Sequence, residues 1–109
     1  MKIVVLAKVQ QYLECLKTIL FEKEYFSFED QAQRYVDELF DEIIECLPKR
    51  PNKPAPPYFE KYGKGMYYAV FKKNKNTHWY VFFKISWKNG EKIYKIRYIA
   101  NNHTVAQYL

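Results

Sequence analysis

The chain has few of the residues that build metal sites and disulfides. It contains only two cysteines and two histidines in 109 residues. Cys15 and Cys46 fall on the apolar stripes of predicted helices, so we expect buried free thiols rather than a disulfide or a metal pair. His78 and His103 lie far apart in the sequence, without nearby cysteine or aspartate, so no zinc site is expected. We therefore predict no metal and no other cofactor.

Long apolar runs are also missing. No segment reaches the roughly 20 apolar residues that a membrane-spanning helix needs, and the opening MKIVVLAKVQQ has no small-residue cleavage site. We therefore expect a cytoplasmic protein without a membrane partner. Its length suits a single domain over residues 1–109, and a hydrophobic content of 49% favours a folded chain over a disordered one.

Acidic residues are scarce in the second part of the chain. Residues 1–47 hold five Lys/Arg and ten Asp/Glu, whereas residues 48–109 hold thirteen Lys/Arg and only two acidic residues, Glu60 and Glu91. The first part is thus acidic by five charges and the second is basic by eleven. This asymmetry favours a polyanionic partner for the C-terminal part. The alternative is a charge pattern that serves only solubility.

Apolar periodicity predicts one short strand and two helices in the acidic part. A β-branched run at residues 2–6 is typical of a strand, and apolar residues at helical spacing predict helices at 8–24 and 28–47. Ser27, followed three residues later by Asp30, predicts the N-cap of the second helix. These two helices are expected to form an antiparallel hairpin.

The basic part begins with a proline-rich connector and continues as strands. All five prolines lie within residues 48–57, where we expect an extended chain, and residues 66–73 predict a strand. Residues 77–102 then predict one long β-hairpin closed at Asn89-Gly90, because a type I′ turn needs positive φ at both central residues. The final residues after Asn102 are too few for an independent helix and are expected to lean on the last strand.

A two-residue turn fixes which residues of the hairpin face each other. One face is almost wholly apolar, with the expected pairs Trp87/Lys92, Ile85/Tyr94, Phe83/Ile96, Val81/Tyr98 and Trp79/Ala100. The other mixes cations with aromatics, with the expected pairs Ser86/Ile93, Lys84/Lys95, Phe82/Arg97, Tyr80/Ile99 and His78/Asn101. The apolar face should bury against the helices, leaving the basic face in solvent.

The predicted fold is therefore α+β, in the order β-α-α-β-β-β. A helical hairpin packs on one face of a small, twisted, mainly antiparallel sheet, and the other face is open and basic. The first strand is expected to pair parallel with the last, whose antiparallel partner is already fixed.

Two lysines that face each other suggest a ligand on the basic face. Lys84 lies opposite Lys95, with Arg97 two residues further along, and like charges across a sheet cost some tenths of a kcal/mol up to about 1. Such a pair is favourable where an anion binds between the cations. The alternative is an ordinary solvated face whose lysines splay into water.

The order β-α-α-β-β-β, the small size, the basic sheet and the ending YIANNHTVAQYL resemble the RelE/ParE superfamily of bacterial toxins from toxin–antitoxin systems. The resemblance implies one of two activities. The RelE-like branch cleaves messenger RNA, usually on the ribosome, without metal, by attack of a ribose 2′-hydroxyl on the adjacent phosphate. The ParE-like branch poisons DNA gyrase by protein contact. Both imply a cognate antitoxin protein as partner. A non-catalytic RNA-binding module is a further alternative.

For the nuclease, the basic face offers a set of candidate residues. Metal-free cleavage needs a proton acceptor, a proton donor and cations for the charge that develops on phosphorus. His103 and His78 are the candidate acid and base, since imidazole titrates near neutral pH. Arg97 and Tyr108 complete the catalytic candidates, and the expected RNA-binding residues are Lys72, Lys84, Lys95, Tyr80 and Phe82.

Each tail residue also has a structural alternative. His103 could be a solvent-exposed tail residue, and Tyr108 could be an anchor packed on the sheet. One position departs from the family pattern: where RelE-like nucleases carry a catalytic arginine, this chain has Trp79, which the expected register turns inward. Either His78 takes that role or the nuclease activity is lost.

Overall fold

The computed structural model describes residues 1–23, 26–105 and 108–109, except for the side chain of residue 104. It confirms the predicted α+β fold: two helices packed against a five-stranded, mostly antiparallel sheet. The helices are α1 (Ala7–Glu22), α2 (Glu29–Cys46) and α3 (Asn102–Val105), with 3-10 helices η1 (Leu47–Lys49) and η2 (Pro57–Tyr62). The strands are β1 (Lys2–Val5), β2 (Lys53–Pro54), β3 (Tyr67–Asn74), β4 (Thr77–Lys88) and β5 (Glu91–Asn101).

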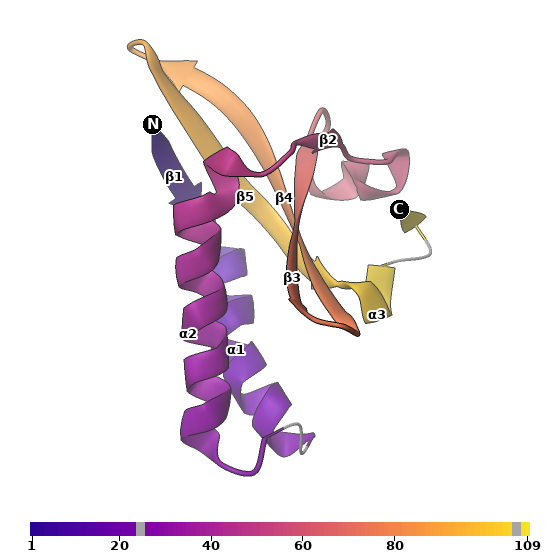
Figure 1. Cartoon of the computed structure of the whole chain (residues 1–109). Coiled ribbons are helices and arrows are strands. Elements are labelled where there is room, and N and C mark those ends of the chain that lie inside the picture. The colour runs from indigo at the N-terminus through magenta and orange to yellow at the C-terminus, as the bar shows by residue number, and fades with distance from the viewer. Residues whose placement is uncertain (24–25, 106–107) are drawn as a thin grey trace.

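The sheet has the order β1-β5-β4-β3-β2 (Figure 1). β1 pairs parallel with β5, as predicted, and the other neighbours are antiparallel. The turn is also as predicted, with positive φ at Asn89 (52°) and Gly90 (78°). Figure 1 shows α1 and α2 beside one face of the sheet, and η2 and α3 beside the other. We call the face away from α1 and α2 the outer face.

The main core lies between the helical hairpin and the sheet. Every second residue of β4 from Trp79 to Phe83 is buried there, together with Ile96 and Ile99 of β5. The helices contribute the residues predicted from their apolar spacing, among them Val9, Leu13, Leu16, Val36, Leu39 and Ile43. Their burial is what holds the hairpin on the sheet, at about 25 cal/mol for each Å² of apolar surface removed from water.

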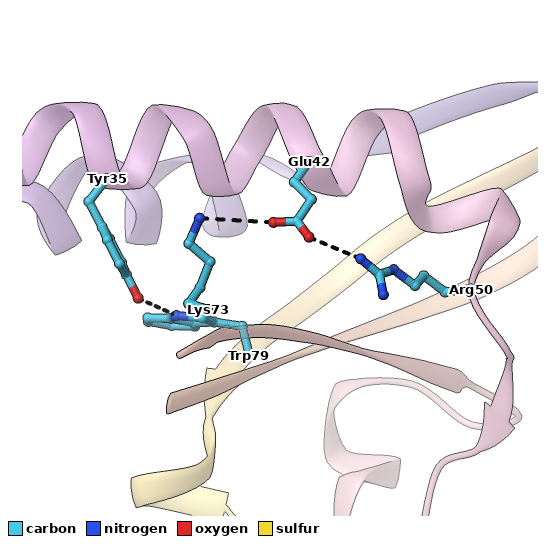
Figure 2. A network of polar contacts seen from close by, with 5 residues as sticks. All are labelled: Tyr35, Glu42, Arg50, Lys73 and Trp79. Carbon is cyan, nitrogen blue, oxygen red and sulfur yellow. Dashed lines mark hydrogen bonds and ion pairs between the residues drawn. The ribbon is translucent and has the colours of Figure 1, made fainter. Parts of the chain in front are cut away.

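A polar network joins α2 to the sheet at the edge of this core (Figure 2). The indole nitrogen of Trp79 donates a 3.0 Å hydrogen bond to the Tyr35 hydroxyl, which satisfies a buried donor. Glu42 on α2 accepts a 2.9 Å ion pair from Arg50 and lies 3.9 Å from the Lys73 ammonium. The inward orientation predicted for Trp79 is thus correct, and it has a polar partner.

The register of the long hairpin is as predicted only from the turn to Phe83, which faces Ile96. A β-bulge then inserts one extra residue at Arg97, so Phe82 faces Tyr98 and Val81 faces Ile99. The predicted pairs Phe82/Arg97, Val81/Tyr98, Tyr80/Ile99, Trp79/Ala100 and His78/Asn101 are therefore wrong.

The bulge shifts the side chains of β5 beyond Arg97 to the opposite faces from those predicted. Ile99 enters the main core, and Tyr98 turns to the outer face. A turn fixes the pairing only as far as the ladder stays regular, and an extra residue moves each later side chain across the sheet.

The outer face is open only over its half near the turn. Elsewhere η2 covers it: the Phe59 ring lies 4.3 Å from that of Phe82, centroid to centroid, and both are fully buried in a second core with Met66, Ala100 and Val105. Phe82 therefore cannot stack on an RNA base, contrary to its predicted role. The proline-rich connector is not wholly extended, because it contains η1, β2 and the start of η2.

Three further details differ from the predictions. The N-cap of α2 is Phe28 rather than Ser27, with no side-chain cap bond. Cys15 is exposed and Cys46 is only partly buried, because both flank the stripe that faces the sheet. The predicted first helix ended at residue 24, which lies outside the described residues. Among the helices described, none is long and apolar enough to cross a membrane.

Replacing Tyr35 tests the link between α2 and the sheet. Tyr35→Phe leaves the buried Trp79 N–H without its acceptor, so we expect the free energy of unfolding to fall by about 1–3 kcal/mol in urea denaturation. Tyr67→Phe is the control, since that phenol is exposed at the edge of β3. Equal stability of the two variants would contradict the role given to this hydrogen bond.

Candidate nucleic-acid interface

A strip of cations crosses the open half of the outer face. Lys84 on β4 faces Lys95 on β5, and Lys2 of β1 lies on the same face, because it pairs with Ile93 two residues before Lys95. Within the described part of the chain, none of these three lysines forms an ion pair. Their mutual repulsion is thus not offset by a carboxylate, and an anion bound between them would relieve it.

The bulge places Arg97 at the end of this strip, beneath the segment that follows η2. Its Nε donates a 2.9 Å hydrogen bond to the backbone carbonyl of Tyr62. The hydrogen bonds of the described residues use only this one of its five N–H donors, so the terminal nitrogens can bind a phosphate. Gly63 is what allows the close approach, because a Cβ there would lie 2.9 Å from Arg97 Nε.

Next to Arg97, η2 and the end of the chain form a cluster of phenols around one ammonium. The Tyr58 and Tyr108 rings stack in parallel, 3.6 Å apart between centroids and with a 1° interplanar angle. Lys61 Nζ lies 4.1 Å from the Tyr58 centroid and 5.4 Å from that of Tyr62. Tyr62 stacks at 3.9 Å on Tyr98, the residue that the bulge turned outward. We call Tyr58, Lys61, Tyr62, Arg97 and Tyr108 the η2 cluster.

The pKa values of Tyr58 and Tyr98 are shifted in opposite directions. Hydrogen bonding to the Lys61 ammonium lowers the pKa of Tyr58 below its ordinary value, and the same contact raises the pKa of Lys61. Burial, followed by the Tyr62 hydrogen bond, raises the pKa of Tyr98 strongly. Tyr58 is exposed and can exchange a proton at the surface, whereas Tyr98 stays protonated and supports Tyr62 by stacking.

The histidines lie at the other end of the outer face, beside α3. His78 faces Lys72 across β3 and β4, and its backbone N–H donates a 2.9 Å hydrogen bond to Asn102 Oδ1. Its Nε2 is buried, with no hydrogen-bond partner among the described residues. His103 is exposed, and its backbone N–H donates to Asn101 Oδ1. The structure thus brings His78, Lys72 and α3 to one end of the sheet.

The two groups of predicted residues lie at different ends of the outer face. Lys84 follows His78 by six residues on β4, which is about 20 Å along an extended strand. Arg97 precedes Asn101, the start of the turn to α3, by four residues, or about 13 Å. Arg97 bonds the Tyr62 carbonyl and Tyr108 stacks on Tyr58, so both border η2, whereas His78 lies beside α3 and His103 within it. Tyr80 is half-buried beside the second core.

Sequence reasoning missed Tyr58, Lys61 and Tyr62 as site residues. A signal was present, because positions i, i+3 and i+4 share one face of a helical turn, and YFEKY carries Tyr, Lys and Tyr at that spacing. The expectation of an extended connector hid it. η2 folds over the sheet because Phe59 is buried against Phe82. No local sequence pattern predicts this contact.

A hollow between the two long helices lies away from the predicted residues. A groove of about 650 Å³ runs between α1 and α2, lined by residues that include Glu14, Lys17, Asp37 and Phe40. Its carboxylates make it a poor site for a polyanion. Across the residues that the structure describes, no cluster of histidine, cysteine and carboxylate side chains could hold a metal ion.

Comparison of the chain with protein-family models, with curated proteins and with solved structures finds no match. The chemistry of the outer face must therefore be inferred from its own residues.

A pair of glycine variants tests whether Gly63 holds Arg97 in place. Gly63→Ala puts a methyl group against the Arg97 side chain at φ +151°, so we expect unfolding free energy to fall by about 1–3 kcal/mol and the Arg97 Nε–H···Tyr62 bond to break. Gly65→Ala is the matched control, since it meets only the left-handed backbone at φ +70°, with nothing within 4 Å.

Thermal unfolding and the NMR signal of the Arg97 Nε–H group check this. A Gly63→Ala protein that keeps an unshifted Nε–H signal and matches Gly65→Ala in stability would show that Gly63 does not position Arg97.

Proposed function

We propose that this chain is a toxin of the RelE/ParE type that cleaves messenger RNA without a metal ion, in the cytoplasm and under the control of an antitoxin. The observation that supports the proposal is that η2 carries Lys61 and the exposed phenol of Tyr58, stacked on Tyr108, while the Tyr62 carbonyl at its end accepts a hydrogen bond from Arg97, two residues along β5 from the Lys84/Lys95 pair. The cations attract a polyanion, and exposed rings stack on unpaired bases.

The reaction assigned to the η2 cluster is a transesterification within the RNA. The 2′-oxygen of a ribose bonds to the adjacent phosphorus, and the bond from phosphorus to the 5′-oxygen breaks, leaving a 2′,3′-cyclic phosphate and a 5′-hydroxyl. Tyr58, whose ionised form Lys61 stabilises, accepts the 2′-hydroxyl proton. Tyr108 donates a proton to the leaving oxygen, and Arg97 stabilises the charge on the phosphorane.

This assignment differs from one that relies on the histidines. His78 lies just past the level of Asn101, about 13 Å or more from Arg97 along the strands, so it fits a contact to a flanking nucleotide better than one to the reacting phosphate, and His103 lies on α3 at that same end. Lys72 faces His78 and serves the same flanking role. Lys84 and Lys95 hold the backbone on the other side of Arg97.

One observation favours the rival activity, contact with a topoisomerase. The helical hairpin reaches well past the sheet in Figure 1, and near its turn Ile19, Phe21 and Phe28 are exposed. Apolar side chains at such a tip suit a protein partner. Growth arrest on expression with intact cellular RNA would favour this rival. Salt-sensitive RNA binding without cleavage or toxicity would favour a plain RNA-binding module.

Cleavage in the presence of EDTA tests the proposal and separates the two candidate centres. With RNA, with or without ribosomes, we expect wild-type protein to cut. Arg97→Ala should lower the cleavage rate by about 10²–10³-fold, as for loss of one charge-stabilising donor. The cleavage rate of His103→Ala should stay within about threefold of the wild-type rate, because a contact to a flanking nucleotide contributes little to the reaction itself.

Lys8→Ala on α1 is the control for loss of a cation away from the outer face. A loss of about 10²-fold in His103→Ala would place proton transfer beside α3 instead. Absence of cleavage by the wild type under both conditions would contradict the nuclease.

The pH dependence tests the pairing of Tyr58 with Lys61. The rate should rise with pH as Tyr58 ionises, with a midpoint below the ordinary tyrosine value of 10.0, and fall once Lys61 loses its proton above 10.5. Lys61→Ala removes the cation that stabilises the phenolate, so the rising limb should move to higher pH. A single-turnover pH profile measures this, and a rising limb unmoved in Lys61→Ala would rule out Tyr58 as the base.

A further inference from the structure

The tip of the β4–β5 hairpin projects beyond the rest of the sheet (Figure 1). β3 pairs with β4 only as far as Phe83, and β1 pairs with β5 only from Ile93 onward. Among the described strands, β4 therefore pairs only with β5 beyond Phe83, and β5 pairs only with β4 before Ile93. The two strands nevertheless keep a fixed pairing here, because the positive-φ residues Asn89 and Gly90 close them in a two-residue turn. We call residues 84–95 the arm.

Trp87 is the large side chain that the arm exposes most. Its exposed fraction is 67%, against 2% for Trp79, the other tryptophan of the chain. It faces Lys92 across the arm, and Lys88 follows it next to the turn. One exposed indole carries little information by itself, since apolar side chains are common on surfaces. Whether Trp87 belongs to a binding site therefore depends on the residues around it.

Those surroundings are cationic. The arm contains four lysines, Lys84, Lys88, Lys92 and Lys95, and one acid, Glu91. The Glu91 carboxylate lies 3.4 Å from the amino nitrogen of Met1, which offsets part of its charge. Both faces of the arm therefore carry positive charge: Lys92 lies on the face of Trp87, and Lys84, Lys88 and Lys95 lie on the other.

This combination fits unpaired RNA better than a lipid surface or a protein. A membrane contact or a protein interface buries several apolar side chains together, whereas Trp87 is the one strongly exposed large apolar side chain of the arm and faces Lys92. Stacking of one base on an aromatic ring, with phosphates against nearby cations, needs only the ring and the charges. Trp87 and Lys92 lie on the face of the hairpin toward the helices and the Lys84/Lys95 pair on the outer face, so an RNA that reaches both passes round the edge of β4 beyond Phe83, where β3 no longer pairs with it.

We propose that the arm is a second RNA contact, in which an unpaired base stacks on Trp87 and an adjoining phosphate lies against Lys92, the residue that faces Trp87 across the arm. The contact rests on RNA being the ligand of the outer face, as in the function proposed above, and it adds a site outside the η2 cluster. It binds and positions the RNA and takes no part in proton transfer.

The two tryptophans give a direct test by fluorescence. The probe is a single-stranded RNA oligonucleotide with 2′-O-methyl groups, which cannot be cut by 2′-hydroxyl attack. Trp79→Phe protein, which reports Trp87 alone, should lose fluorescence on binding. Trp87→Phe protein, which reports the buried Trp79, should not change.

Affinity is measured separately in the full-length protein by anisotropy of labelled RNA. Trp87→Ala should weaken binding about 5- to 100-fold, the range for loss of one base stack. Phe28→Ala, which removes an equally prominent exposed ring at the start of α2, should leave affinity unchanged. Because Trp87 is exposed, its removal should leave the circular dichroism spectrum intact.

The outcomes separate this inference from the proposed function. If wild-type protein binds and cuts RNA while Trp87→Ala does so equally well, the arm contact is wrong and the η2 cluster stands. If wild-type protein binds no RNA, both fail. A blue shift of Trp87 with anionic lipid vesicles but no response to RNA would also overturn the inference in favour of a membrane contact.

Discussion

The β-bulge at Arg97 is the local constraint on which the outer face depends. One extra residue in β5 sends Ile99 into the main core and turns Tyr98 outward, where it stacks under Tyr62. Arg97 itself then bonds the carbonyl of Tyr62, so η2 is held over the sheet by a ring stack and a hydrogen bond from neighbouring residues. Bulges bend a strand and redirect side chains, and this one creates the junction between the lysine strip and the η2 cluster.

The fold and half of the hairpin register could be predicted because their signals are local or repeat along the chain. Apolar spacing gave the helices, and Asn89-Gly90 gave the turn, so Phe83 and Ile96 were placed correctly. The bulge has no comparable signature, since Arg97 is an ordinary strand residue in sequence. Its position is decided by which of Tyr98 and Ile99 is better buried against the helices, and this is a property of the whole core.

The candidate site was predictable in composition but not in arrangement. Lys84, Lys95 and Arg97 share the outer face as expected, and Arg97 meets Tyr108 through η2. Phe82 was misplaced because its burial depends on Phe59, which lies 23 residues away in a segment expected to be extended. The histidines were expected to share an end of the sheet, and His78 does lie beside α3, yet that end is separated by several residues of strand from the strongest cations.

The proposed function requires RNA to lie on the outer face around Arg97. Amide NMR spectra of ¹⁵N-labelled protein, titrated with an uncuttable 2′-O-methyl RNA, test it most directly. Shifts are predicted to concentrate at Lys61, Tyr62, Lys84, Lys95, Arg97 and Tyr98. Shifts confined to α1 and α2, with the outer face unchanged, would contradict it.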